Sequence, residues 1–416
     1  MRILVLTTRL FGTPTSGGEL CTARLLAVLR DGGHEIVLVG RGDETEAAVW
    51  TPHVVSLGGI VGPFDELGRW RSLAAVASAL LARRPITVSR QRVPLSAERL
   101  AGLLRPCDAV VVDHLQAWPW LRGIRSRPLL LVNHNVESDN YMRQSRAALA
   151  NGQGHAVGRW VRRYLMRREA HGLRQLELEV LAQAQVLACL SEDDSERLRS
   201  FAERARLDVH ARLAVLPGYP LAPPVHRRQG TGEALPAVGL LGTWTWAPNR
   251  EGLRWFLARV WPAIAGRARL VLAGSGLEGL ELPAQAQVMG RISQVSDFYG
   301  AVDVVAVVSL SGSGVQEKAI EALGTGAAVV ATRHALRGLL QDLPPHVRIE
   351  DDPARFGQAC LEAGRAPCDQ ATELALQWAS GRRDVYTRSV AACLSRLSEA
   401  DQRQGATDDA ELVTTS

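Results

Sequence analysis

The sequence predicts an α/β fold of two Rossmann-like, doubly wound parallel-sheet domains that face a central cleft. Three observations indicate this fold. The chain has 416 residues, which is enough for two domains at roughly 150 to 200 residues each. Short apolar runs rich in Val, Ile and Leu alternate with helical patterns, as in a parallel sheet covered on both faces. A stretch with five prolines and three glycines, residues 217–236, separates two such series and is typical of a linker.

The first series supplies an N-terminal domain at residues 1–217, expected to be the acceptor side. Its predicted strands are residues 3–7, 35–39, 109–113, 129–133, 185–190 and 213–216. A helix at residues 19–30 fits between the first two strands, because its apolar residues recur on one face. Gly32 and Gly33 follow it and end it.

The second series follows a linker at residues 218–236 and supplies a C-terminal domain at residues 237–380, expected to bind the donor. Its predicted strands are residues 238–242, 269–272, 287–289, 304–308 and 328–331, and its helices are residues 248–260 and 314–324. Residues 372–397 have a long helical pattern. We expect a closing helix at residues 381–400 to complete the fold. The polar residues 401–416 are expected to be disordered.

Composition excludes several classes of function. The net charge of +5 comes almost entirely from arginine and is too small to indicate nucleic-acid binding. The six cysteines are scattered and form no CxxC pair, which predicts reduced thiols in the cytoplasm. The N-terminus has no signal-peptide pattern. There is no HExxH, no DxD at a strand end and no Cys/His cluster, so no metal site and no cofactor are expected.

The loop after the first predicted strand ends in Ser-Gly-Gly-Glu. Gly17 and Gly18 allow a ligand to approach the backbone closely, and the helix that follows offers unpaired N–H groups and a positive dipole end, which suit a diphosphate. The alternative is a tight strand-to-helix turn without a ligand. The spacing is neither GxGxxG nor a Walker motif, which disfavours ATP hydrolysis.

The only lysine of the chain, Lys318, follows a glycine-rich segment that contains Ser313 and Gly314. Lys318 and Glu321 are three residues apart and share one part of a helix surface. An ammonium group near a helix start can neutralise a phosphate, and a carboxylate one turn later can accept hydrogen bonds from ribose hydroxyls. The alternative is a surface ion pair, and Glu317 is a rival for Glu321. A single lysine in an arginine-rich chain favours a functional role.

Two further strand ends carry polar groups. His134 lies between two asparagines after residues 129–133, where it could bind a sugar hydroxyl or a leaving phosphate; a structural histidine is the alternative. Gly242 and Thr243 end the first strand of the second domain and could present N–H and hydroxyl groups to a phosphate. Trp244 and Trp246, which follow, are expected to cap the core.

The segment from Arg159 to Arg174 has six arginines and one acidic residue, interleaved with aromatic and aliphatic side chains. A solvated helix face is the simpler interpretation. Peripheral contact with anionic lipid at the inner membrane face is the alternative.

These motifs resemble those of the retaining glycosyltransferases of family 4, which have the type B architecture of two Rossmann-like domains. The resemblance covers about residues 1–395. It is most specific in VGLLGTWTWAPN, LVLAGSG, VMGRISQVSDFYGAVDVVAVV and GSGVQEKAIEALGTGAAVVAT, and SGGE, NHNVES and LACLSEDD support it in the first half.

The resemblance implies transfer with retention of configuration and without a metal. It implies that Glu321, the second glutamate of the family's E-x7-E motif, binds the nucleotide ribose. It places Gly17 and Gly18 near the donor diphosphate, and His134 beside the donor sugar. Ser191 matches a serine that the family carries at a strand end.

The sequence departs from the family at two points. Ser313 stands where the first glutamate of the motif would be, and its spacing to Gln316 fits a helix capping box. The loop at residues 242–249 carries neither the Arg nor the Lys that many members have there. The charge of the phosphates would therefore fall to Lys318, helped by Arg291.

The sequence thus predicts a cytoplasmic, metal-independent hexosyltransferase of glycan biosynthesis, with no partner among nucleic acids. It would move a sugar from a nucleotide diphosphate donor to a hydroxyl group of a glycan, a lipid-linked sugar or a natural product. A sugar-nucleotide epimerase and a non-catalytic binding protein for nucleotide sugars are the alternatives.

Overall fold

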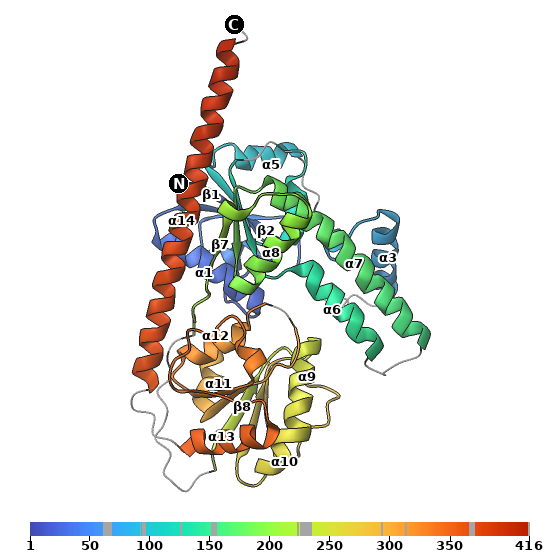
Figure 1. Ribbon diagram of the computed structural model, residues 1–416, viewed down its shortest axis with the longest axis vertical. Coiled ribbons are helices and arrows are strands. Elements are labelled where there is room, and N and C mark those ends of the chain that lie inside the picture. Colours follow the sequence, from blue (N-terminus) through green and yellow to red (C-terminus); the bar gives the residue numbers. More distant parts are fainter. Residues whose placement is uncertain are drawn as a thin grey trace. The chain divides into compact units, whose positions relative to one another are not determined.

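The computed structural model describes residues 1–60, 69–91, 93, 97–124, 127–150, 156–222, 224, 235–292, 294–312, 314–365 and 371–414. The chain forms two compact units (Figure 1). Unit 1 consists of Met1–Leu216 together with Thr387–Ser416, and unit 2 consists of Pro217–Tyr386. Each unit is an α/β domain built on its own parallel sheet, which confirms the predicted fold class.

Unit 1 contains a seven-stranded sheet in the order β3-β2-β1-β4-β5-β6-β7, with every pair parallel. The strands are β1 (Arg2–Leu6), β2 (Glu35–Gly40), β3 (His53–Ser56), β4 (Ala109–Val112), β5 (Leu129–Asn133), β6 (Val186–Cys189) and β7 (Leu213–Val215). The helices are α1 (Gly17–Asp31), α2 (Glu44–Ala47), α3 (Arg69–Leu81), α4 (Ile86–Arg90), α5 (Ala97–Leu104), η2 (Leu115–Leu121), α6 (Glu137–Ala150), α7 (Ala156–Gln183), α8 (Glu192–Arg204) and η3 (His210–Arg212).

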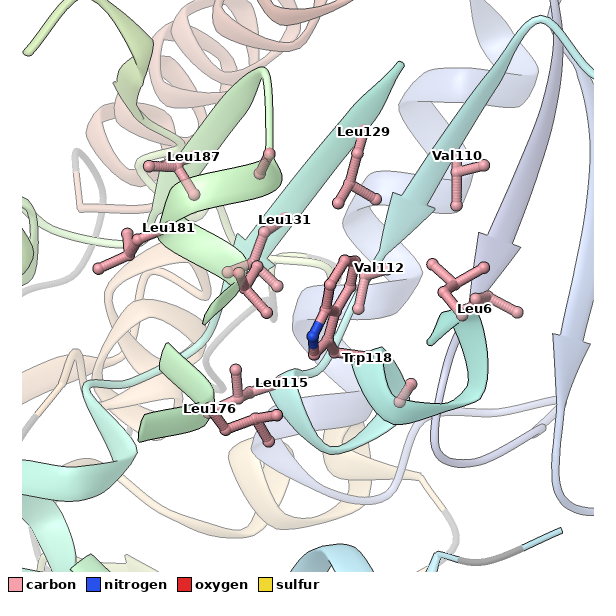
Figure 2. Packing of buried hydrophobic residues seen from close by; sticks show 14 of the residues in the cluster. Leu6, Val110, Val112, Leu115, Trp118, Leu129, Leu131, Leu176, Leu181 and Leu187 are labelled. Atoms are coloured by element: carbon pink, nitrogen blue, oxygen red, sulfur yellow. The ribbon is translucent and has the colours of Figure 1, made fainter. Parts of the chain in front are cut away.

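Leucine and valine side chains of the central strands make the core of unit 1 on one face of this sheet. Leu6, Val112 and Leu131 come from neighbouring strands, and Trp118 of η2 packs among them (Figure 2). Leu176 of α7 closes the cluster on the helical side. Each such side chain contributes about 1.5–3 kcal/mol to stability when fully buried. This packing therefore stabilises the strands that carry the loops of unit 1.

Unit 2 contains a six-stranded sheet in the order β10-β9-β8-β11-β12-β13, also parallel throughout. The strands are β8 (Ala237–Leu241), β9 (Arg269–Ala273), β10 (Gln287–Gly290), β11 (Val304–Val307), β12 (Ala328–Ala331) and β13 (Val347–Ile349). The helices are α9 (Ala247–Trp255), the π-helical η4 (Phe256–Val260), α10 (Trp261–Ile264), α11 (Val295–Ala301), α12 (Glu317–Gly324), η5 (Arg333–Leu336) and α13 (Pro353–Arg365).

The last helix, α14 (Ala371–Thr414), begins in unit 2 and ends in unit 1. In unit 2, Arg382 donates to the carbonyl of Gly218 at 2.8 Å. In unit 1, Arg396 donates to the carbonyl of Leu213 at 3.2 Å. The sequence had predicted a closing helix that ends at residue 400 and a disordered end after it, whereas the helical backbone continues to Thr414.

The predicted strands agree with the observed ones to within one or two residues, but two short edge strands were not predicted. β3 and β13 have three half-buried residues each and lack the continuous apolar run on which the prediction relied. The helix predicted at residues 248–260 is present, but its last turn, Phe256–Val260, is a π-helix. Most of the predicted linker, residues 225–234, falls outside the described residues.

Each sheet reverses its strand order once, between β1 and β4 in unit 1 and between β8 and β11 in unit 2. Ligands of open α/β sheets bind at the carboxyl ends of the strands beside such a switch point. Within each unit, the loops after its two switch-point strands are therefore where the functional groups of that unit should meet. Over the part of the chain that the structure describes, no helix is both long enough and apolar enough to cross a bilayer.

Candidate functional site

The switch point of unit 1 brings together one carboxylate and two imidazoles. Asp113 and His114 directly follow β4, and His134 directly follows β5. The Asp113 carboxylate is fully buried. One of its oxygens lies 3.0 Å from Nε2 of His134, and the other lies 3.1 Å from Nδ1 of His114.

Two hydroxyl groups complete the surroundings of Asp113. Thr7 after β1 donates to Oδ2 at 3.3 Å, and Thr22 of α1 donates to the same oxygen. Four groups from four segments thus converge on one carboxylate. Such a buried network fixes the two histidine rings more firmly than a single hydrogen bond would.

The network also determines which ring nitrogens remain for a ligand. An ionised carboxylate only accepts hydrogen bonds, so Nε2 of His134 carries the hydrogen that faces Asp113. Nδ1 of His114 faces the other carboxylate oxygen at an ion-pair distance. The other two nitrogens lie on the side of Gly18. A Cβ built on Gly18 would be 3.3 Å from Nε2 of His114 and 4.0 Å from Nδ1 of His134. The ring centroids are 4.1 Å apart.

The protonation of this group follows from its charges. Burial alone would raise the pKa of Asp113, but His134 and His114 outweigh it and hold that pKa well below the usual range. Burial alone would lower the pKa of His114, but the charge and hydrogen bond of Asp113 reverse this, and Glu137 and Glu19 add to the rise. The His114 pKa is therefore raised, which favours an imidazolium beside the first turn of α1.

The ligand atoms of Asp113, His114 and His134 lie within 4.8 Å of one another, so these residues have the composition of a metal site. Hydrogen bonds already engage the carboxylate on both oxygens. That the protein acts without a metal ion stays a prediction. His114 was not among the residues predicted from the sequence, although an Asp-His pair directly after a strand that borders the switch point was a usable signal.

The first turn of α1 is built by its capping residues. Ser16 is the N-cap, and its hydroxyl accepts a hydrogen bond from the amide of Glu19 at 3.3 Å. Glu19 reaches back to the amide of Thr15 at 2.6 Å and pairs with Arg9 at 3.0 Å. Gly17 and Gly18 occupy the turn whose N–H groups have no acceptor within the helix. The predicted glycine pair therefore does lie at the start of a capped helix.

The switch point of unit 2 joins the two loops that the sequence analysis singled out. Nζ of Lys318, in the first turn of α12, donates to Oδ1 of Asn249 at 3.1 Å and to the carbonyl of Val308 at 3.3 Å. The Asn249 amide donates in turn to the carbonyl of Thr243 at 3.1 Å. Asn249 therefore links Lys318 to the loop after β8, where Gly242 and Thr243 lie.

Lys318 is a cation held among neutral groups. The acceptors of its two hydrogen bonds are an amide oxygen and a carbonyl oxygen. Burial, and secondly the charge of Arg337, lower its pKa to about 8. Arg337 contacts the loop after β11, which also contains Val308, by donating to Oγ of Ser309 at 3.5 Å. A bound anion would oppose both effects, because a nearby negative charge raises the pKa of an ammonium group.

Glu321 lies one turn beyond Lys318 and is buried. Its carboxylate accepts hydrogen bonds from the amides of Leu221 at 3.0 Å and Ala222 at 2.7 Å. It therefore fixes the chain just before the undescribed part of the linker. Glu317 begins α12 and is half-buried.

The remaining predicted residues of unit 2 lie on its loops. Gly314 has a φ of 71°, a left-handed conformation that favours glycine, and Arg291 is exposed after β10. Ser313 lies outside the described residues. Gln316 is the N-cap residue of α12 but makes no side-chain cap; its amide donates to Ser309 at 3.0 Å instead.

The expectation for the two tryptophans was half right. Trp244 is buried and donates to the carbonyl of Ala273 at 2.9 Å. Trp246 is 44% exposed and does not cap the core. The five described cysteines are buried, and their reduced state stays a prediction.

Unit 1 also contains a cavity of about 470 Å³ between α4, η2 and α7. Its lining includes the cations Arg83, Arg84 and Arg122 and the ring of Trp120. Arg122 is paired with Glu179, so the other two arginines supply the net charge. The cavity has the chemistry to hold a ligand with an anionic group and an apolar or ring-shaped part.

Comparison with known proteins bears on both units. The family model described as glycosyl transferases group 1 matches residues 236–364, which is most of unit 2 and includes Lys318 and Glu321. No curated protein sequence matches the chain.

Several solved structures share the whole architecture. Anabaena HepE in complex with UDP is 16% identical, with a TM-score of 0.59, over 95% of this chain and 100% of that one. Sucrose-phosphate synthase from Thermosynechococcus elongatus is 16% identical, with a TM-score of 0.52, over 100% of both chains. WaaG, a glycosyltransferase involved in lipopolysaccharide biosynthesis, is 14% identical, with a TM-score of 0.52, over 94% of this chain and 98% of that one. The chain thus has the fold of these proteins, two parallel-sheet α/β domains, and its second domain matches the sequence model of group 1 glycosyl transferases.

Proposed function

We propose that the protein is a glycosyltransferase that moves a hexose from a nucleotide diphosphate donor to a hydroxyl group, with retention of configuration. One observation carries the proposal. The only lysine of the chain stands at the switch point of unit 2, with a second cation, Arg337, nearby. Within the described residues, its hydrogen bonds go to two neutral oxygens. This is the arrangement that a phosphate group would complete.

The comparisons support the same assignment. The matched model of group 1 glycosyl transferases spans the residues that hold Lys318. HepE, which has a similar fold, is described in complexes with UDP, with UDP and glucose, and with UDP-glucose. A nucleoside diphosphate sugar is therefore the first class of ligand to test.

In the proposed mechanism the groups of unit 2 hold the donor. Lys318 neutralises the phosphates, with help from Arg291 and from the loop residues Ser313 and Gly314. Gly242 and Thr243 supply backbone and hydroxyl groups to the same phosphates. Glu321 accepts hydrogen bonds from the ribose hydroxyl groups.

In unit 1, His134 and the first turn of α1 stabilise the charge that develops as the sugar leaves the diphosphate. The amides of Gly17 and Gly18 and the helix dipole favour an anion at this place. His134 is oriented for this by Asp113, which holds its Nε2 at 3.0 Å. The leaving phosphate, rather than a side-chain base, receives the proton of the acceptor hydroxyl. No metal ion or further cofactor takes part in this scheme.

The acceptor is a hydroxyl group on a glycan, a lipid-linked sugar or a natural product, bound by unit 1. The cationic cavity of unit 1 is the candidate place for an acceptor that carries a phosphate or carboxylate group.

The test is an incubation with UDP- and GDP-hexoses in the presence and absence of candidate acceptors. Release of the nucleoside diphosphate that depends on acceptor supports transfer. Conversion of the donor without acceptor would identify an epimerase instead, and tight binding without any turnover would identify a binding protein. Lys318→Met and His134→Asn should each reduce this turnover, because the proposal assigns a role in the reaction to both residues.

A further inference from the structure

The first turns of α7 present an apolar face that nothing in the described structure covers. Val157, Trp160, Val161 and Tyr164 are 75%, 64%, 52% and 64% exposed. They stand at positions i, i+3, i+4 and i+7 and therefore lie along one face of the helix. Single exposed apolar residues are ordinary on protein surfaces, but four in register on one helix face indicate a surface for binding.

The other half of α7 fixes this face in space. Leu173, Leu176 and Val180 are buried in the core of unit 1. At the point where burial begins, Glu169 accepts hydrogen bonds from the amides of Ile86 at 2.6 Å and Thr87 at 2.9 Å. The exposed turns are thus the continuation of an anchored helix, and α6 runs beside them (Figure 1).

The charged residues in this part of α7 all have the same sign. The twelve residues 156–167 include four arginines and no acidic residue. Arg163 and Arg167 follow Trp160 and Tyr164 by three positions and lie along one edge of the face. The Arg163 guanidinium is 5.6 Å from the centre of the Trp160 ring.

This combination fits one kind of surface. Tryptophan and tyrosine, with an apolar ring and one polar atom, are the side chains that favour the boundary between lipid chains and headgroups. Arginine binds phosphate groups and can extend its charged end from an apolar surface. We propose that the exposed face of α7, residues 157–164 with the flanking arginines, lies on the anionic phospholipid surface of a membrane.

The proposal does not depend on sugar transfer. It assigns a binding surface to unit 1 that is separate from the Asp113, His114 and His134 group. The sequence alone favoured a solvated helix face for residues 159–174, because it could not reveal that the aromatic side chains among them are the ones left exposed.

The test is flotation of the full-length protein with vesicles of phosphatidylcholine alone and with vesicles that contain about one third phosphatidylglycerol. The wild-type protein should float with the anionic vesicles and remain behind with the neutral ones. Trp160→Ser combined with Tyr164→Ser should reduce the bound fraction at least tenfold, and Arg163→Glu combined with Arg167→Glu should do the same. Brominated lipids should quench tryptophan fluorescence in the wild type and less in Trp160→Phe.

Two matched controls distinguish binding through this face of α7 from non-specific adsorption of the protein to vesicles. Leu376→Ser with Val385→Ser removes two exposed apolar side chains from α14, which are 46% and 41% exposed. Arg254→Glu with Arg259→Glu reverses two exposed charges in unit 2. Both pairs should leave flotation unchanged. Failure of the wild type to bind anionic vesicles at low salt, or equal binding by the α7 variants, would overturn the proposal. Turnover of a water-soluble donor and acceptor is a separate readout, and we expect it to be unchanged in the α7 variants.

Discussion

Gly18 lies so close to His114 that a Cβ on the glycine would be 3.3 Å from Nε2 of the imidazole. Gly18→Ala should therefore push the ring or the helix start by a few tenths of an ångström and fill part of the space where we place an anion. We expect a loss of donor turnover of about tenfold or more, because misplacement of this size is costly in catalysis. Steady-state kinetics with a nucleotide sugar would measure it.

Gly102→Ala in α5 is the control for this change, since a Cβ there would meet nothing within 4 Å. It should leave turnover unchanged and stabilise the fold by about 0.5–1 kcal/mol, as for other glycines inside helices. Unchanged turnover in Gly18→Ala would contradict the assignment of an anion site at the start of α1.

Protonation of His114 should control anion binding in unit 1. Its pKa is raised above the ordinary histidine value because the attraction of Asp113 exceeds the effect of burial. The imidazolium is therefore fully present below about pH 6.5 and is lost as the pH rises through the higher folded value, together with the stability it contributes. An NMR titration of the histidine ring should show the raised value directly.

Asp113→Asn should lower that pKa, since it removes the negative charge while keeping the size of the side chain. Donor binding in this variant should weaken at a lower pH than in the wild type. An identical His114 titration in the two proteins would show that Asp113 does not set the charge of the pair.

Lys318 should give unit 2 a second and different pH dependence. With a pKa of about 8 in the unliganded protein, its ammonium is charged at neutral pH and largely neutral at pH 9. The affinity for a nucleoside diphosphate should therefore fall between these values. Lys318→Met should lower the affinity at pH 7 about ten- to hundredfold, the range expected for one charged hydrogen bond, and abolish this pH dependence; calorimetric titration would show both effects. Arg254→Met, which removes an exposed cation of the same unit, should change neither.

Glu321 should matter for stability as well as for ribose binding. Glu321→Ala leaves the amides of Leu221 and Ala222 without their acceptor, at a cost of about 1–3 kcal/mol each if they stay buried. Chemical denaturation would measure this loss. Glu317→Ala is the comparison, because that side chain does not accept from these amides. If the Glu321 variant unfolds like the wild type but fails to bind donor, its role is in binding alone.

The alternation of apolar runs and helices was enough to predict both sheets, because buried parallel strands have a continuous apolar pattern. The edge strands β3 and β13 lack that pattern and were missed. The candidate site residues at strand ends could also be predicted, because the carboxyl ends of parallel strands lie at one edge of their sheet. Lys318 and the loop at residues 242–249 were both singled out, but their connection through Asn249 was not.

Contacts between distant segments could not be read from one sequence. Glu321 meets backbone amides a hundred residues earlier, and no local pattern indicates this. His114 gains its raised pKa from a carboxylate that also holds a histidine of the next strand. In both cases the tertiary arrangement, rather than the residue type, determines what the side chain can do.

The path of α14 has a consequence for anyone who wishes to divide this protein. A cut after Leu216 would separate unit 1 from residues 387–416, whose Val390, Cys393, Leu394 and Leu397 are buried. The amino-terminal fragment would then expose the surface that these side chains cover, and the carboxyl-terminal fragment would bear an unpacked apolar helix. Independent production of unit 1 therefore calls for a fusion that carries the final helix back to it, while unit 2 is the simpler piece to express, from Pro217 to Tyr386.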